Sequence, residues 1–452
     1  MKKVQEPRVR KTHTVEPTVK KSLTVTSRVH RQLLIGLLAG IVVMSVVVLS
    51  GQELEHLPPA APAFTVLHPL AGAPRDGAFP YAGLISSGNL YGTTYEGGSG
   101  RCFDRESGES GCGVVFTLSP AGTETVLHNF KGGDGANPHA DLILDAAGNL
   151  YGTALGGGVE GGFCGGDGTC GLVFKLSPTG TETVLHSFTG GEDGANPLAG
   201  LLRDAAGNLY GTTYVGGAFS FGVVFELIRC SSAPSGYDFK VLYSFKGGAD
   251  GANPEAGLIK DAAGNLYGTT FFGGVKSTAC LEGASCGVVF KVSPSGTEKV
   301  LYSFTGPDGA NPQAGLVRDA AGNLYGTTSG GGADDHGVVF ELVRCSSVAS
   351  GYEFKVLHTF TGYPTDGASP VAGLLRDAAG NLYGTTEAGG ASEFGVVFKL
   401  SPTGTEKVLH SFTNGKDGAT PRAGLIQDAV GSLYGTALGG AHGAGVVFKL
   451  TP

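Results

Sequence analysis

Residues 196–230 read NPLAGLLRDAAGNLYGTTYVGGAFSFGVVFELIRC, and this stretch recurs along the chain. Its Leu-Tyr-Gly tripeptide occurs seven times in the 452 residues, with successive tyrosines 51 to 60 residues apart. A fixed period of this length indicates a repeat architecture, either a solenoid or a propeller, in which each copy is one structural unit. The seven tyrosines are Tyr91, Tyr151, Tyr210, Tyr267, Tyr325, Tyr383 and Tyr434.

Each copy contains four short runs rich in Val, Leu, Phe, Tyr and Thr, typified by AGLLRD, NLYGTT, GVVFKL and ETVLHSF. Runs of four to seven such residues predict β-strands, here named A to D in order. Asp-Ala-Ala-Gly-Asn separates A from B, and Ser-Pro-Thr-Gly-Thr separates C from D. Because both linkers consist of turn-forming residues, we expect antiparallel hairpins and a four-stranded unit.

The two ends of the repeat region favour a closed ring. The last copy stops at GVVFKLTP (445–452) without a strand D, whereas Phe64–His68 (FTVLH) is a lone D sequence before the first strand A. A linear solenoid does not require a strand D displaced to the front of the repeats. In a ring, this strand pairs with the last strand C and removes the free edges. The sequence therefore predicts an all-β fold, a seven-bladed β-propeller of four-stranded antiparallel blades over residues 63–452.

The repeated unit resembles the GloVer tandem repeats of bacterial exported proteins, and its Asp-x-x-Gly-Asn-Leu-Tyr hairpin is similar to that of NHL-type propellers. The resemblance covers residues 64–452. It implies the propeller fold but no catalytic residues, because a shared fold does not transfer an activity. The chain contains no Trp, which excludes the blade motifs of the WD40 and quinone-dehydrogenase type.

The N-terminal region predicts export. Residues 1–32 hold nine Lys and Arg against two Glu, and residues 33–50 (LLIGLLAGIVVMSVVVLS) are an uncharged apolar run. We expect a basic cytoplasmic tail (1–32), a transmembrane anchor or the core of a cleaved signal peptide (33–50), and a linker (51–62). Positive charge before the apolar run orients the rest of the chain to the extracytoplasmic side, either anchored to the membrane or periplasmic or secreted.

Residues that recur in every blade are expected to build the blade. Asp-Gly-Ala-x-Pro between strands D and A, and the A–B turn aspartates, are interpreted as turns and not as metal ligands. One strand-D position alternates between His and Tyr, which is typical of an aromatic packing site. We therefore predict no metal site and no cofactor. These residues are Asp76, Asp134, Asp193, Asp250, Asp308, Asp366 and Asp417; Asp145, Asp204, Asp261, Asp319, Asp377 and Asp428; and His68, His128, His186, Tyr243, Tyr302, His358 and His410.

Residues that differ between blades are the better functional candidates. Propeller geometry brings the D–A and B–C connections to one face, termed the top face here. After each Asp-Gly-Ala-x-Pro come Tyr81, His139, Leu198, Glu255, Gln313, Val371 and Arg422, and after each strand B come Tyr95, Leu155, Tyr214, Phe271, Ser329, Glu387 and Leu438. An invariant frame that presents different polar and aromatic side chains suits a binding mouth. The predicted ligand-binding set is Tyr81, His139, Glu255, Gln313, Arg422, Tyr95, Tyr214, Phe271 and Glu387.

Six of the eight cysteines form pairs within single B–C loops: Cys102 with Cys112, Cys164 with Cys170, and Cys280 with Cys286. An exported protein meets an oxidising compartment, so we expect three local disulfides, and the spacings do not fit a zinc site. Cys230 and Cys345 lie in C–D insertions of non-adjacent blades, so they are expected to be free or partnered elsewhere.

These observations predict an extracytoplasmic binding or scaffold protein that recognises a glycan, a peptide or a cell-envelope component on the top face. One alternative is a polysaccharide hydrolase or lyase that uses top-face carboxylates, such as Glu255 with Glu387. Another is a structural surface module without a ligand. The protein is expected to be monomeric. It is also expected to bind no nucleic acid, because outside the tail it holds 22 basic against 37 acidic residues.

Overall fold

The computed structural model describes residues 62–452, except for 105–107, 110, 160–163, 165–168 and 281–284. The described residues belong to one compact unit. The described residues contain no helix, so none that could span a membrane. The predicted apolar segment 33–50 and the tail before it lie outside the described residues.

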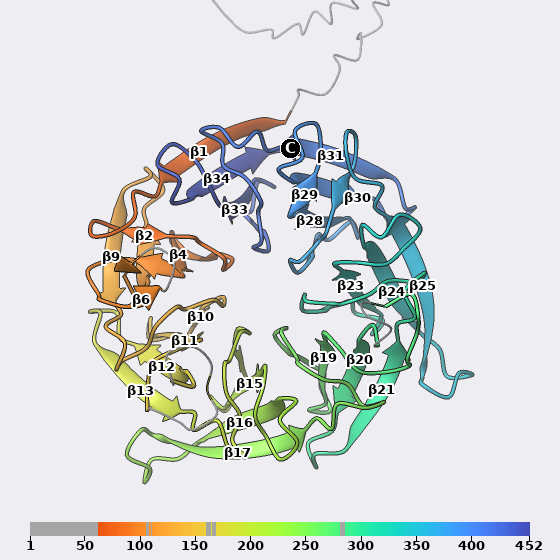
Figure 1. Ribbon diagram of the computed structural model, residues 1–452, viewed down its shortest axis with the longest axis horizontal. Coiled ribbons are helices and arrows are strands. Elements are labelled where there is room, and N and C mark those ends of the chain that lie inside the picture. The colour runs from red at the N-terminus through yellow and green to blue at the C-terminus, as the bar shows by residue number, and fades with distance from the viewer. Residues whose placement is uncertain (1–61, 105–107, 110, 160–163, 165–168, 281–284) are drawn as a thin grey trace, which may run out of the picture. The chain divides into compact units, whose positions relative to one another are not determined.

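Seven four-stranded antiparallel sheets surround a central axis, as the sequence predicts (Figure 1). Blade 1 consists of β3 (Ile85–Ser87), β4 (Asn89–Thr94), β8 (Val114–Leu118) and β9 (Glu124–Asn129). Blade 2 consists of β10 (Ile143–Leu144), β11 (Leu150–Ala154), β12 (Leu172–Leu176) and β13 (Glu182–Ser187). Blade 3 consists of β14 (Leu202–Arg203), β15 (Leu209–Thr213), β16 (Val223–Arg229) and β17 (Tyr237–Ser244).

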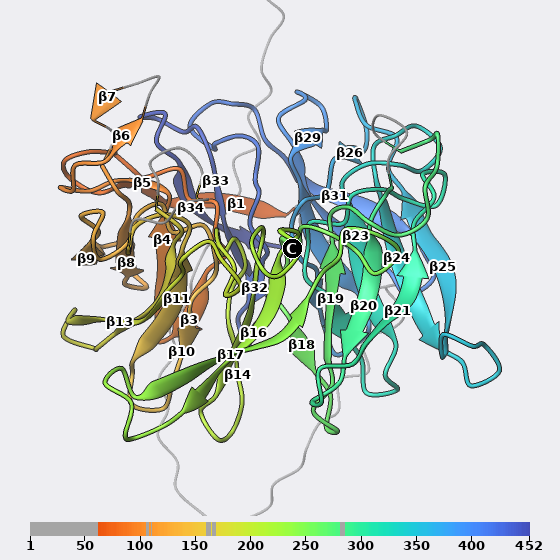
Figure 2. The same cartoon turned by 60° about the horizontal axis from the view of Figure 1, so that its bottom comes forward.

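The remaining blades repeat this order of strands. Blade 4 consists of β18 (Ile259–Lys260), β19 (Leu266–Thr270), β20 (Val288–Val292) and β21 (Glu298–Ser303). Blade 5 consists of β22 (Val317–Arg318), β23 (Leu324–Thr328), β24 (Val338–Arg344) and β25 (Tyr352–Thr359). Blade 6 consists of β27 (Leu375–Arg376), β28 (Leu382–Thr386), β30 (Val396–Leu400) and β31 (Glu406–Ser411). Figure 2 shows the strands of one blade side by side, for example β19, β20 and β21.

Blade 7 closes the ring in the predicted way. It consists of β32 (Ile426–Gln427), β33 (Leu433–Ala437), β34 (Val446–Thr451) and the N-terminal strand β1 (Ala63–Pro69). In Figure 1, β1 lies beside β34, and Phe64 pairs with Leu450 in an antiparallel register. A second link joins the last blade to the first, because Thr436 Oγ1 donates to the carbonyl oxygen of Ala82 at 3.1 Å.

Strand A is shorter than predicted. It has three residues in blade 1 and two in the other blades, against the four to seven expected. Only Leu202 and Arg203 of blade 3, for example, pair with strand B. The reason lies between blades: Thr212 of strand B donates its hydroxyl to the carbonyl oxygen of Ala256 in the next blade, at 3.2 Å. The segment before strand A is therefore bonded across the seam and does not continue the ladder.

Three short two-stranded sheets were not predicted. β2 (Gly77–Ala78) pairs with β5 (Glu96–Gly97), and β26 (Gly367–Ala368) pairs with β29 (Ala388–Gly389). The third consists of β6 (Phe103–Asp104) and β7 (Gly108–Glu109) within a B–C loop. All three join connecting segments outside the blades, so they leave the blade plan unchanged.

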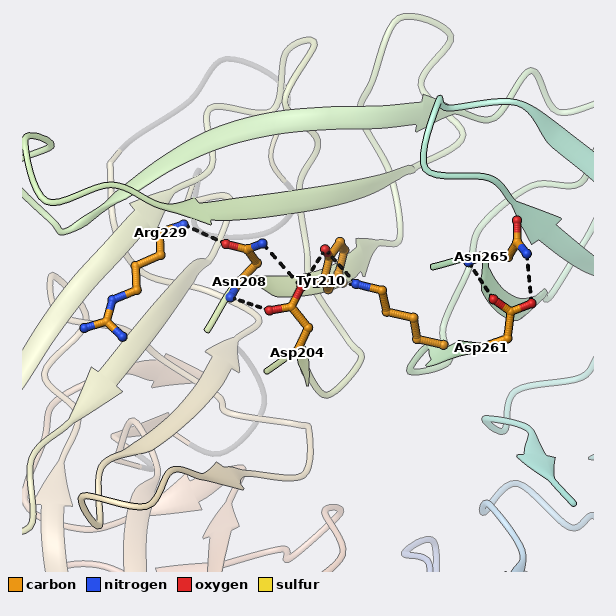
Figure 3. Close-up of polar contacts among 7 residues, drawn as sticks. Asp204, Asn208, Tyr210, Arg229, Asp261 and Asn265 are labelled. Carbon is orange, nitrogen blue, oxygen red and sulfur yellow. Dashed lines mark hydrogen bonds and ion pairs between the residues drawn. The ribbon is translucent and has the colours of Figure 1, made fainter. Parts of the chain in front are cut away.

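The A–B aspartates build turns, as expected. Asp204 accepts hydrogen bonds from the Asn208 backbone N–H at 2.9 Å and from the Tyr210 hydroxyl at 3.0 Å (Figure 3). Partial burial opposes ionisation of Asp204, but the Lys260 ammonium, 3.1 Å from the carboxylate, and these two hydrogen bonds outweigh it and lower the pKa of Asp204. The Asp261 and Asn265 turn of the next blade repeats the arrangement.

Candidate functional site

The connections of the top face share one backbone conformation in all seven blades. The fourth residue of Asp-Gly-Ala-x-Pro has a positive φ in all seven copies, and four of these residues are Asn, which tolerates that conformation. The Tyr214 N–H donates to the backbone carbonyl of Asn196 at 3.0 Å, while the Asn253 side-chain amide of the next blade donates to the Tyr214 carbonyl at 3.0 Å. The residue after strand B is therefore fixed by its backbone, and its side chain is free to vary.

The D–A aspartates fix the start of the same connection. Asp250 accepts from the backbone N–H of Lys246 at 2.9 Å and from the hydroxyl of Tyr243 at 2.7 Å. In other blades a strand-D histidine takes the place of this tyrosine, as with His186 and Asp193 at 3.2 Å. The interpretation of these aspartates as turn residues is confirmed. The aromatic position also carries a hydrogen bond, which the sequence did not indicate.

The seven side chains that follow Asp-Gly-Ala-x-Pro come together at the mouth of the central channel. They line one cavity of about 90 Å³, and its lining is Tyr81, His139, Leu198, Glu255, Gln313, Val371 and Arg422. Pockets that enclose small-molecule ligands usually measure about 300–1,000 Å³. This cavity is too small for a sugar ring, so a ligand of that size would lie over the mouth and contact its outer side chains.

Three of the predicted aromatic residues form a cluster at one side of the mouth. The Tyr81 ring stacks on His139 with their centroids 5.1 Å apart, and it meets Tyr95 edge to face at 5.3 Å. Tyr95 also contacts His139 edge to face at 6.1 Å. These are the separations at which aromatic pairs attract one another.

A charged pair completes the edge of this cluster. The Arg422 guanidinium donates to the carboxylate of Glu387, which follows β28, and it also lies 5.4 Å from the centroid of Tyr81. The prediction that Arg422 and Glu387 belong to one surface is therefore matched by a direct contact. The remaining predicted residues contribute less to the mouth: Tyr214 lies near Glu255, and Phe271 packs edge to face on Phe272 at 4.5 Å.

Two groups in the mouth titrate far from their ordinary values. Burial raises the pKa of Glu255 to about 7. Burial lowers the pKa of His139 to about 4, with a smaller contribution of the same sign from the Arg422 charge. Near neutral pH the mouth therefore holds a neutral imidazole and a carboxyl group that is close to half ionised.

One singular residue, Asp141, was not predicted and lies in the channel below the mouth. Together with strand-A residues, a ring of one residue per blade lines a space of about 410 Å³ there, and the ring members are Gly83, Asp141, Gly200, Gly257, Gly315, Gly373 and Gly424. The Asp141 side chain faces the channel and is surrounded by protein. This burial raises the pKa of its carboxyl group. It accepts the Gly83 N–H at 2.5 Å. An aspartate where six copies have glycine is the signal that the same comparison of blades would have found.

The three predicted disulfides are present. Cys102–Cys112, Cys164–Cys170 and Cys280–Cys286 are bonded, with Cα atoms 5.1, 4.9 and 5.3 Å apart. Cys230 and Cys345 are free cysteines. Disulfides of this kind persist in oxidising compartments, so they suggest an extracytoplasmic environment.

Solved structures with related architecture include three proteins of low sequence identity. The chain is 16% identical to a gluconolactonase from Xanthomonas campestris (TM-score 0.36), over 62% of this chain and 78% of that one. It is 15% identical to a putative 6-phosphogluconolactonase from Bacteroides uniformis (0.47; 81% and 100%) and 16% identical to a luciferin-regenerating enzyme (0.42; 69% and 90%). These likenesses carry no inference about the ligand or activity of this chain.

A search of curated proteins finds no match. The Gloeobacter/Verrucomicrobia repeat, in contrast, matches three overlapping stretches, residues 102–281, 163–344 and 277–452. Together these stretches extend from blade 1 to the last strand of blade 7. The chain belongs to the Gloeobacter/Verrucomicrobia repeat family.

Proposed function

We propose that this propeller is an extracytoplasmic binding protein whose ligand, best fitted by a glycan of the cell envelope, lies on the mouth of the top face. The observation that supports this is the gathering of non-repeated side chains around one cavity, above blades that otherwise repeat. If these positions served folding alone, we would expect the same residue types to recur there in all seven blades.

The chemistry of the mouth suits a carbohydrate. Tyr81 and Tyr95 offer aromatic faces on which the apolar face of a sugar ring packs. Gln313, Glu255 and Arg422 offer both donors and acceptors for sugar hydroxyl groups. Because Arg422 is already paired with Glu387, it is held in place before a ligand arrives, which lowers the entropic cost of binding.

The hydrolase or lyase alternative has less support. Glu255 has the raised pKa that a general acid needs. Its proposed partner Glu387, however, is engaged by Arg422, and a second free carboxylate beside Glu255 does not line the cavity. We therefore favour a binding function over a catalytic function.

Binding is tested by screening the protein against envelope polysaccharides and then comparing Tyr95→Ala and Arg422→Ala with the wild type. We expect each change to weaken the detected binding about tenfold, the effect of losing roughly 1.4 kcal/mol at an interface residue. Lys416→Ala is the matched control, because Lys416 is an exposed cation in the same D–A connection that leads to Arg422. Equal affinities in all variants would contradict the proposed mouth, and polysaccharide cleavage lost in Glu255→Gln would favour the enzyme.

The raised pKa of Glu255 predicts that the stability of the folded protein depends on pH. Its pKa is about 7 in the folded protein and close to the usual value of about 4.3 in the unfolded chain, so the folded state holds the extra proton between these values. The contribution of this group is therefore complete below pH 4 and is lost as pH rises through 7. We expect Glu255→Gln to melt closer to the wild type at pH 5 than at pH 8, where it should melt a few degrees higher than the wild type. A melting-temperature difference that stays constant from pH 5 to 8 would contradict this prediction.

A further inference from the structure

One position of strand D, the residue that pairs with the last buried residue of strand C (Phe64 with Leu450, Glu124 with Leu118), lies against the preceding blade, beside that blade's strand-D aromatic residue. At three seams the residue at this position is a phenylalanine that stacks on the aromatic ring. Phe64 lies 3.8 Å from His410, Phe239 lies 3.9 Å from His186, and Phe354 lies 4.0 Å from Tyr302, all between ring centroids. These seams are filled by apolar contact and leave no buried acceptor at this position.

At the other four seams the residue at this position of strand D is a glutamate. In each case its Oε1 atom is buried and has no hydrogen-bond partner. A buried acceptor without a partner costs about 1–3 kcal/mol, and more when it is charged, so each such oxygen needs a proton or a cation. The four residues are Glu124, Glu182, Glu298 and Glu406.

The seam between blade 7 and blade 1 brings three metal-binding side chains together. His68 Nε2 lies 3.3 Å from Asp76 Oδ2 and 3.7 Å from Glu124 Oε2. All three side chains are largely buried, with 20%, 8% and 10% of their surfaces exposed. A single Nε2–H serves only one of the two carboxylates, and the other Asp76 oxygen already accepts the Ala71 N–H at 2.7 Å. The cluster therefore has more acceptors than protons to share.

We propose that His68, Asp76 and Glu124 form a binding site for a divalent transition-metal ion of the Zn²⁺ class. Neighbouring ligand atoms of a tetrahedral zinc site, with bonds of about 2.0–2.2 Å, lie roughly 3.3–3.6 Å apart. The His68–Asp76 distance of 3.3 Å agrees with this spacing, and the His68–Glu124 distance of 3.7 Å is slightly longer. An imidazole favours zinc over calcium, which prefers oxygen ligands, and the partly exposed His68 leaves room for water as the fourth ligand.

No metal site was predicted from the sequence, because the strand-D histidine and the D–A aspartate were considered alone. Glu124 comes from strand β9 of the next blade, 56 residues after His68. Among the residues that the structure describes, this is the one group of His, Asp and Glu whose ligand atoms all lie within 4.8 Å. Glu182 and Glu406 face His–Asp pairs of the same residue types, so they serve as internal controls.

The ion would join β1, the strand that closes the ring, to blade 1. We therefore expect Zn²⁺, added to the full-length chain after treatment with EDTA, to raise its melting temperature by a few degrees. Co²⁺ in place of Zn²⁺ should give the visible absorption of a tetrahedral site. Both measurements are repeated with Cys230 and Cys345 changed to Ser, because free thiolates also bind these ions.

The variants separate metal binding from folding. Glu124→Phe introduces the stacked arrangement of the three apolar seams, so it should fold normally and lose both the Zn²⁺ shift and the Co²⁺ spectrum. His68→Ala should lose both signals as well. Glu182→Gln and Glu406→Gln should retain them. The proposal is overturned if the folded wild type gives neither signal, if Glu124→Phe retains them, or if Ca²⁺ stabilises the chain as much as Zn²⁺ does.

Discussion

A chain that lacks residues 1–70 is expected to melt about 10 °C or more below a chain that lacks only residues 1–60. The additional ten residues include β1, which pairs with β34 along its length. Phe64 of this strand stacks on His410 and meets Phe412 edge to face in blade 6, so its loss also opens the seam between blades 6 and 7. A side chain of this size contributes about 1.5–3 kcal/mol when it is fully buried, and Phe64 is partly buried.

The comparison of the two truncated chains can be extended by adding the missing strand back as a peptide. Without β1, the edge of β34 is unpaired and becomes a template for other strands, so the shorter chain should also form larger species in size-exclusion chromatography. A synthetic peptide of residues 60–70 should pair with that edge and restore part of the melting temperature, whereas a scrambled peptide should not. Equal melting temperatures of the two truncated chains would show that β1 does not close the ring.

The blades could be predicted because each of their features appears seven times in the sequence. In blade 3, Leu209 lies in the core, Tyr210 donates to the A–B turn aspartate Asp204, and Gly211 pairs with strand C. The Leu-Tyr-Gly tripeptide recurs in all seven copies and the turn aspartate in six. The short strand A could not be predicted in the same way. It depends on Thr212 bonding to Ala256 in the next blade, and such a contact exists only once the ring has formed.

The candidate site was predicted in outline because comparison of the blades identifies the residues that vary. This comparison selected the residues of the mouth, including Tyr81 and Arg422. It could not indicate the Arg422–Glu387 pair or the small size of the cavity, since both depend on side-chain packing across the axis. The cluster at His68 was not predicted, for a related reason. Glu124 occupies a strand-D position that is also Glu in other blades, and it is distinguished from them only by its contact with His68 of the neighbouring blade.

Replacement of Gly268 by valine is expected to destabilise the propeller by about 3 kcal/mol, the upper part of the usual range for overpacking a core. Gly268 belongs to the Leu-Tyr-Gly motif of blade 4 and pairs with Phe290 of strand C. A Cβ atom at this position would lie 2.7 Å from Phe290 Cζ and 2.9 Å from Leu258 Cδ2, well inside van der Waals contact. Phe290 is fully buried and has no room to move away. Thermal or denaturant unfolding measures the loss.

The reason for this glycine is steric, because its φ lies outside the left-handed region, and the control is chosen accordingly. Gly133 also lies outside that region, and a Cβ atom added there would have no atoms within 4 Å, so Gly133→Ala should leave the melting temperature unchanged. Shortening the opposing ring tests the contact itself. The double variant Gly268→Val with Phe290→Leu should lose less stability than the two single variants added together, because the smaller side chain makes room for valine. Strict additivity would mean that Gly268 is required for a reason other than the Phe290 ring, and the seven repeats of Leu-Tyr-Gly would then need another explanation.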